Sequence, residues 1–177
     1  MINAMVAMML TTSGLGAAPA PRTPVPSVRA LSDCARVTLA DARRRSATVA
    51  RLVAELQRAD MIVLIDTRAD PALPTGRTIL IGTAAGVRFV HVLLNSMMSV
   101  YDRIEYLGHE LQHAVEIAED PLAVDGPSLR RRFAAIGWEP PDSTRYRPTF
   151  ETDGARLVSL QIRRELSNPP KAASGRR

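Results

Sequence analysis

The sequence predicts an α+β domain in which a small, mostly antiparallel sheet of about three strands packs against several helices. One amphipathic helical pattern lies near the start of the chain, three short β-like runs follow it, and three further helical patterns come after those runs. A helix, then strands, then helices is an α+β order of elements.

The first half of the domain is expected to contain one helix and the three strands. The helix is predicted within residues 39–58, where apolar residues recur at helical spacing among arginines; they are Val49, Leu52, Val53 and Leu56. The strands are predicted at 61–65, 78–81 and 87–94, because these runs are rich in β-branched and other apolar residues and are separated by prolines and glycines.

The second half is expected to be helical. The longest helical pattern covers residues 99–119, and a shorter one covers 127–136. A last helix is predicted at 149–166, opened by Thr149 as the N-cap residue after Pro148.

The ends of the chain differ from this middle part. Residues 1–20 carry no charge and resemble a signal peptide, with an apolar start and small residues that suit a cleavage site. Residues 21–36 are predicted to be a proline-rich disordered linker, 37–166 the folded domain, and 167–177 a disordered tail. If the signal peptide is real, we expect an exported protein, periplasmic or secreted; otherwise we expect a cytoplasmic one.

Composition excludes several classes of protein. With 46% hydrophobic and 23% charged residues, the chain is not wholly disordered. The single cysteine, Cys34, excludes a disulfide framework and a cysteine-rich zinc module, so a metal site must use histidines and carboxylates. The arginine runs at 43–45 and 130–132 lack interleaved aromatic residues, so no nucleic-acid partner is predicted. The apolar start is shorter than the roughly 20 residues of a membrane span, so no stable span is predicted.

The longest helical pattern contains His109-Glu110-Leu111-Gln112-His113, the HExxH pattern of zinc hydrolases. Histidines four residues apart stand on one face of a helix, so both can reach one ion, and Glu110 lies where it can meet a water at that ion. The alternative is a merely solvated polar face. The apolar stripe of this helix lies on the other side and disfavours buried core histidines; it comprises Ile104, Leu107, Leu111, Ala114, Val115 and Ala118.

A catalytic zinc takes three protein ligands, so a third donor is needed. Glu151 is the preferred candidate, because we expect it in the first turn of the last helix, which could pack across the HExxH helix. Asp153, Glu116, His91 or none of these are the alternatives, and Glu116 is disfavoured because a straight helix does not easily wrap three ligands around one ion. An ordinary acid at a helix N-terminus is the other interpretation of Glu151.

Hydrolysis of an amide also benefits from a hydrogen-bond donor to the developing oxyanion. Tyr146, just before the last helix, and His91, on the third predicted strand, are the candidates. A packing tyrosine and a buried strand histidine are the ordinary alternatives.

Two segments carry a resemblance to a known family. The segment from Tyr106 to Glu116, Tyr-Leu-Gly-His-Glu-Leu-Gln-His-Ala-Val-Glu, and the later Phe-Glu-Thr-Asp-Gly-Ala-Arg at 150–156 resemble a group of poorly characterised bacterial proteins of the gluzincin metallopeptidase type. The HExxH and the later glutamate are also similar to those of thermolysin, although Phe150 stands where thermolysin has an asparagine.

The resemblance covers about residues 87–165 and implies a zincin-like fold. It implies that His109, His113 and Glu151 bind zinc and that Glu110 is the general base. By analogy with zincins, the strand at 88–94 would bind a peptide substrate by β-addition.

The function predicted from the sequence is therefore that of a zinc-dependent metallopeptidase, which cleaves a peptide or protein substrate with a metal-activated water and Glu110 as general base. The alternatives are a non-catalytic metal-binding protein that retains a zincin-like fold, and a metal-dependent hydrolase of a non-peptide amide. The intact Glu110 favours an enzyme, because a purely structural zinc site has no need of a base there.

Overall fold

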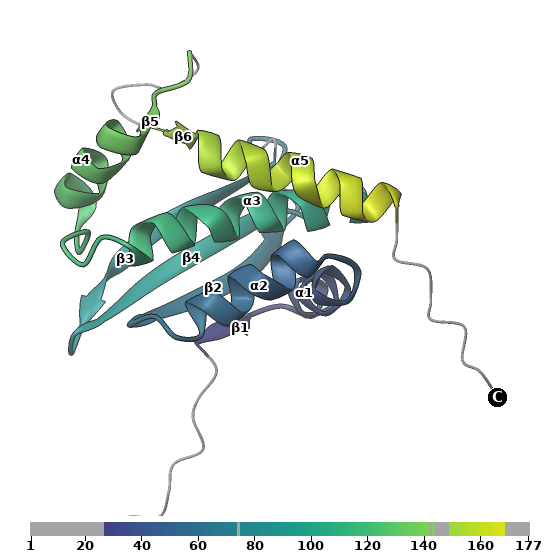
Figure 1. The fold of residues 1–177 in the computed structure, drawn as a ribbon. Helices are drawn as coiled ribbons and strands as arrows, with labels where there is room; N and C mark the ends of the chain where they lie inside the picture. Colours follow the sequence, from purple (N-terminus) through teal and green to yellow (C-terminus); the bar gives the residue numbers. More distant parts are fainter. Residues whose placement is uncertain (1–26, 74, 142, 144–148, 169–177) are drawn as a thin grey trace, which may run out of the picture.

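The computed structural model describes residues 27–73, 75–141, 143 and 149–168, and it confirms the α+β class (Figure 1). In chain order the elements are β1 (Val28–Ala30), α1 (Asp33–Arg45), α2 (Ala47–Leu56), β2 (Met61–Arg68), β3 (Gly76–Ala84), β4 (Val87–Asn95), α3 (Val100–Ala118), α4 (Gly126–Ile136), β5 (Gly137–Trp138), β6 (Glu151–Thr152) and α5 (Asp153–Ser167).

The main sheet has four strands in the order β1-β2-β4-β3. It is mixed, because β1 pairs with β2 and β2 with β4 in parallel, and only β3 and β4 are antiparallel. The predicted three-stranded, mostly antiparallel sheet is therefore wrong. The antiparallel pair is joined by a tight turn in which Ala85 and Gly86 have φ of 49° and 77°, as in a two-residue hairpin. Helices α1 and α2 connect β1 to β2, and such a crossover makes strands parallel.

Strand β1 and the first turn of α1 lie within residues 21–36, which the sequence analysis assigns to a disordered linker. That boundary is wrong, because Val28 is buried in the core and the sheet begins there. A strand of three residues is too short to show a periodic pattern. At the other end α5 extends to Ser167, one residue past the predicted domain end. The predicted signal peptide lies outside the described residues.

The single helix predicted at 39–58 is two helices that meet at Ser46. The side chain of Ser46 accepts a hydrogen bond from the backbone of Val49, which starts a new helix there. Its hydroxyl also donates to the carboxylate of Glu165 at 2.6 Å, and the hydroxyl of Thr48 donates to the same carboxylate at 2.7 Å. The break therefore ties the start of α2 to the end of α5.

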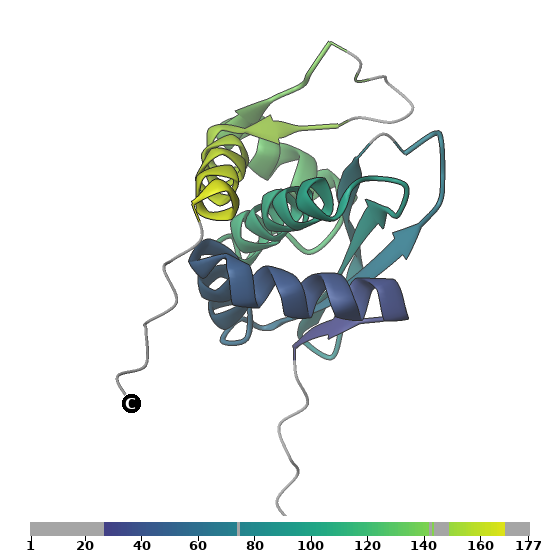
Figure 2. The same cartoon turned by 90° about the vertical axis from the view of Figure 1, so that its right-hand side faces the viewer.

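The large helices lie on one face of the main sheet (Figure 2). Side chains of α3 pack there on alternate residues of the central strands, such as Val63, Val90 and Val92. Helix α5 crosses over α3 at Gly108, where a Cβ atom would lie 2.0 Å from Cδ1 of Ile162, so any larger residue there would force the Ile162 side chain to move. None of the helices among the described residues is long and apolar enough to span a membrane.

The edge of the sheet next to α3 is β3. Strand β4 lies between β2 and β3, so both of its sides are already paired. The expectation that residues 88–94 add a substrate strand is therefore wrong, since only a strand with a free side can do so. Because β4 pairs with β2 on its other side, β3 and not β4 lies at this edge.

Arg88 on β4 anchors the C-terminal end of α3. Its guanidinium is 2% exposed and donates to the backbone oxygens of Ile117, Ala118 and Asp120 at 2.6, 3.1 and 2.7 Å, and to the carboxylate of Asp60 at 2.6 Å. The last carbonyl groups of a helix have no hydrogen-bond donors within the helix, and the Arg88 side chain supplies these donors.

Replacing Arg88 by Ala is expected to lower the free energy of unfolding by about 3 kcal/mol, because it leaves buried carbonyls without donors and opens a cavity. Urea unfolding of the variant and the parent measures the difference. The control is Arg131→Ala on the exposed side of α4, which should change stability by less than about 0.5 kcal/mol. Equal unfolding midpoints for the Arg88 variant and the parent would contradict the anchoring role.

Candidate metal centre

His109 and His113 lie on α3 and direct their Nε2 atoms toward one carboxylate. The distances from Glu151 Oε1 are 3.6 Å to Nε2 of His109 and 3.9 Å to Nε2 of His113. One candidate ligand atom from each of the three residues lies within 4.8 Å of the others. The residues predicted as zinc ligands are thus brought together.

The opposite ring nitrogen of each histidine is already engaged. Nδ1 of His109 lies 3.2 Å from the hydroxyl of Ser159 on α5, and Nδ1 of His113 lies 2.9 Å from Oε2 of Glu116. Such partners hold an imidazole in one orientation and leave Nε2 for a metal. Glu116, weighed as a third ligand in the sequence analysis, is therefore a partner of His113 instead.

The three side chains suit zinc by their chemistry and spacing. Two imidazole nitrogens and one carboxylate oxygen form a usual catalytic donor set, and donors around a tetrahedral zinc lie about 3.4 Å apart. The distances from Glu151 to the two histidines, 3.6 and 3.9 Å, are close to this spacing, and all three donor atoms lie within 4.8 Å of one another. His109, His113 and Glu151 could therefore hold a zinc ion and leave a fourth position toward the cleft.

Glu151 reaches the cluster from a strand and not from a helix. It belongs to β6, whose two residues pair with β5 through Trp138 and Gly137. The N-cap residue of α5 is Thr152, so the predicted helix start at Thr149 is wrong. Asp153, the neighbouring alternative ligand, is exposed at the first position of α5 and is not part of the cluster.

His91 does not reach the cluster. Along β4 the side chains alternate between the two faces of the sheet, and Val90 and Val92 belong to the core beneath α3. His91 therefore points to the opposite face, beside its register partners Leu64 and Ile79. Its predicted roles as oxyanion donor or ligand are wrong, and Tyr146, the other predicted donor, lies outside the described residues.

Glu110 lies beside the histidines against the edge strand. The side chain is 4% exposed, and its Oε2 accepts a hydrogen bond from the hydroxyl of Thr78 at 2.7 Å. A Cβ atom at Gly76 would lie 3.2 Å from the Cγ of Glu110 and 2.9 Å from Leu94, so the glycine makes room for this carboxylate.

The polar face of α3 is buried, and not solvated. Glu105, Glu110, His113 and Glu116 are each at most 7% exposed, because α5 and β3 pack against α3 and Thr152 of β6 contacts Glu116. Thr152 Oγ1 donates to Glu116 Oε1 at 2.8 Å and joins the start of α5 to this face. The helical period showed that the face was polar, but not that other elements would pack over it.

Burial and nearby charges shift the pKa values of His113 and Glu116 in opposite directions. Burial lowers the pKa of His113, but the hydrogen bond to Glu116 and the nearby carboxylates outweigh it, so the pKa is raised. Burial raises the pKa of Glu116, but the hydrogen bonds from His113 and Thr152 outweigh it, so the pKa is lowered. In the metal-free protein the two groups thus stabilise each other's charged forms.

The cluster opens into a cleft of about 1350 Å³ between β3 and α4. Phe133 of α4 lies 5.5 Å from the ring of His113 and stacks on Phe150 at 6.0 Å, measured between ring centroids, so one wall beside the cluster is aromatic. Tyr106 lines the cleft with its ring 6.1 Å from that of His109. Burial and the charge of Glu105 raise the pKa of Tyr106, so its hydroxyl remains a donor.

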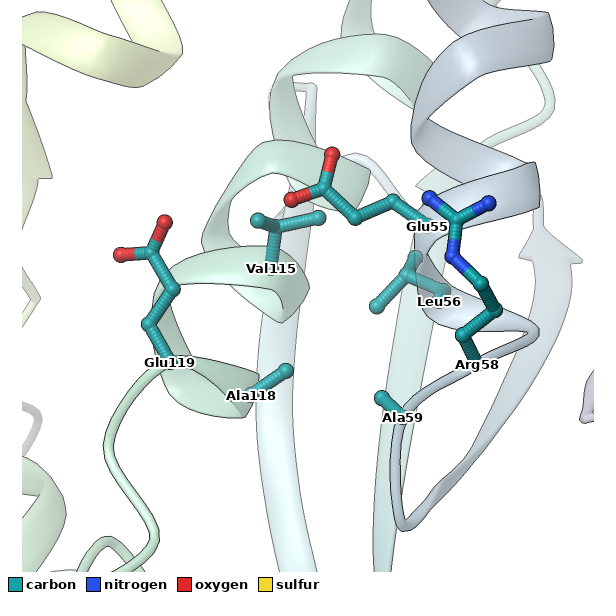
Figure 3. Close-up of a pocket in the computed structure, with 7 residues that line it drawn as sticks. All are labelled: Glu55, Leu56, Arg58, Ala59, Val115, Ala118 and Glu119. Atoms are coloured by element: carbon teal, nitrogen blue, oxygen red, sulfur yellow. The ribbon is translucent and has the colours of Figure 1, made fainter.

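A smaller hollow of about 270 Å³ lies between the C-terminal ends of α2 and α3 (Figure 3). Its floor is apolar, with Leu56 and Val115, and Glu55 and Glu119 stand at its rim. No histidine lines it, so the cleft at β3 is the candidate site.

Sequence reasoning missed the partners that orient the site. Thr78, Ser159 and Thr152 each contact a site residue from another element, and their spacing along the chain follows no motif. Only a glutamate three residues after the second histidine, Glu116, could have been found by its position on the same face of the helix.

No protein-family model matches this chain, and no curated protein or solved structure is detectably similar to it. The resemblance to gluzincins therefore rests on the motif residues alone.

Proposed function

We propose that this protein is a zinc-dependent peptidase whose metal is held by His109, His113 and Glu151. The observation that carries the proposal is the convergence of both Nε2 atoms on Glu151 at the floor of a cleft, with Glu110 beside them. Glu110 is not needed to hold the metal, and a buried carboxylate next to an open ligand position has the place of a general base.

When bound at this site, zinc supplies Lewis-acid polarisation of the scissile carbonyl and makes water more acidic. Oε2 of Glu110 already accepts a hydrogen bond from the hydroxyl of Thr78, and within the described part of the chain no side chain donates to Oε1, so Oε1 is the freer oxygen to accept a proton from the attacking water. Glu110 then passes that proton to the nitrogen of the leaving amine, and the carboxylate is regenerated.

Among the described residues, no strand pairs with the side of β3 that faces away from β4, and this side offers a place for an extended peptide. The backbone N–H of Asn95 donates a hydrogen bond to the carbonyl of Thr75. Along an antiparallel strand, the backbone N–H and C=O groups of successive residues alternate between facing the partner strand and facing away from it. Gly76, Thr78 and Leu80 therefore point their N–H and C=O groups away from β4, along the wall of the cleft. Addition of a substrate strand there would bring a peptide bond over the metal cluster.

The test is to reconstitute the purified full chain with zinc, measure bound metal by mass spectrometry, and assay a mixture of internally quenched fluorescent peptides. We expect about one zinc per chain, and peptide cleavage that is lost with a chelator and restored by zinc. His91→Ala, on the other face of the sheet, is the matched histidine control and should keep both properties. A chain that binds no zinc after reconstitution, or a zinc-loaded chain that cleaves no peptide, would overturn the proposal.

A further inference from the structure

Thr78 makes an unusual pair of contacts with the candidate general base. Its hydroxyl oxygen lies 2.7 Å from Oε2 of Glu110 and 2.9 Å from the backbone oxygen of the same residue. Within the described part of the chain, no other side chain donates a hydrogen bond to this carboxylate. Since Glu110 is 4% exposed, the contact is sheltered from competing water.

The same residue belongs to the free side of the edge strand. Thr78 stands opposite Val92 in a pair whose backbone groups point away from each other, so its N–H and C=O face the cleft. Its side chain points toward α3. One residue thus contacts Glu110 through its hydroxyl and offers a backbone pair to anything that adds to β3.

The packing around Thr78 and Glu110 limits the movement of both side chains. Gly76, two residues earlier on the same side of β3, leaves the space that the Glu110 side chain occupies. The backbone of β3 is held by its pairing with β4, and α3 is held by α5 at Gly108. The hydrogen bond therefore joins two elements that are each fixed by packing.

We infer that Thr78 is a positioning residue that aligns the Glu110 carboxylate with a substrate strand paired on β3. The inference rests on the proposed peptidase function and deepens it. Thr78 positions a substrate through its backbone groups and the Glu110 carboxylate through its hydroxyl. The distance between the scissile peptide bond and the base therefore depends on the position of this one residue. Thr78 itself exchanges no proton with the substrate.

The test compares Thr78→Val, which removes the hydroxyl at nearly constant shape, with Thr78→Ser, which keeps it. For the zinc-loaded full chain and a cleaved fluorescent peptide, we expect Thr78→Val to lower kcat by about 10- to 100-fold with KM nearly unchanged. Thr78→Ser should restore kcat to within a few-fold of the parent, and both variants should bind about one zinc. Thr83→Val is the matched control, because this threonine of β3 bonds to the carbonyl of Val124, away from Glu110.

A second measurement does not depend on activity. Unfolding midpoints of the metal-free parent, Thr78→Val, Glu110→Ala and the double variant form a cycle, and we expect the double variant to lose less stability than the two single losses added together. Thr83→Val with Glu110→Ala should be additive. Additive losses for Thr78 and Glu110 would overturn the contact, and an active parent whose kcat is unaffected by Thr78→Val would overturn the positioning role alone. A zinc-loaded parent without hydrolysis would overturn the proposed function, and this inference with it.

Discussion

Replacing Glu110 by Gln is expected to lower kcat by about 10³-fold while the chain still binds one zinc. Glutamine has nearly the same shape, and its amide oxygen can accept the hydrogen bond from Thr78, so the packing between α3 and β3 should survive. What is lost is the carboxylate oxygen that takes the proton from water. Steady-state kinetics on a cleaved peptide and metal analysis of the same sample measure the two quantities.

Glu119→Gln is the control for this experiment. Glu119 caps the C-terminal end of the same helix, is exposed and pairs with Arg132, so its loss removes a carboxylate from α3 without touching the cluster. The kcat of the Glu119→Gln variant should equal that of the parent. Undiminished hydrolysis by the Glu110 variant would exclude Glu110 as the base, and loss of zinc would assign it a role in binding the metal.

Replacing Glu151 by Ala is expected to weaken zinc binding by more than about 100-fold, the upper range for changes that merely disturb a ligand's partners. Removing it leaves two histidines and reduces the donor set below that of a usual catalytic site. The side chain is 26% exposed and belongs to a short strand, so the fold should tolerate the change. Competition against a chromophoric chelator measures the affinity.

Asp153→Ala distinguishes Glu151 from its neighbour. Asp153 lies two residues further on, is exposed at the start of α5, and interacts with the helix dipole there. Its replacement should leave zinc affinity unchanged within a few-fold. The opposite result, with tight binding in the Glu151 variant and weak binding in the Asp153 variant, would reassign the third ligand.

The helix that carries the candidate site was predictable nearly residue for residue. The sequence predicts a helix at 99–119, and α3 runs from Val100 to Ala118 between the caps Ser99 and Glu119. A serine N-cap and an apolar stripe act within a few residues of chain, so a local pattern is enough to predict them. The strands at β2, β3 and β4 were found for the same reason, although each extends beyond its apolar core.

The sheet and its edge were not predictable in this way. β1 is a three-residue strand that forms because β2 lies beside it. Whether two strands pair in parallel depends on the segment that connects them, which for β1 and β2 is the pair of helices α1 and α2. The hydrogen bond from Ser46 to Glu165, which is 119 residues away in the chain, is likewise a contact between distant segments. These features are set by contacts between distant segments, and a pattern within one segment carries no information on them.

For the candidate site, the sequence by itself determined that His109 and His113 share one face of a helix with Glu110 next to them, since the helical repeat settles this within a single turn. Only the tertiary structure decided which side chains surround that face. It brings Glu151 in from β6, Thr152 from the N-cap position of α5, Ser159 from the middle of α5 and Thr78 from the edge strand, and it turns His91 away to the other side of the sheet. The physical reason is that the helical period sets angles around one axis, whereas approach between elements is set by side-chain packing at points such as Gly108 and Gly76.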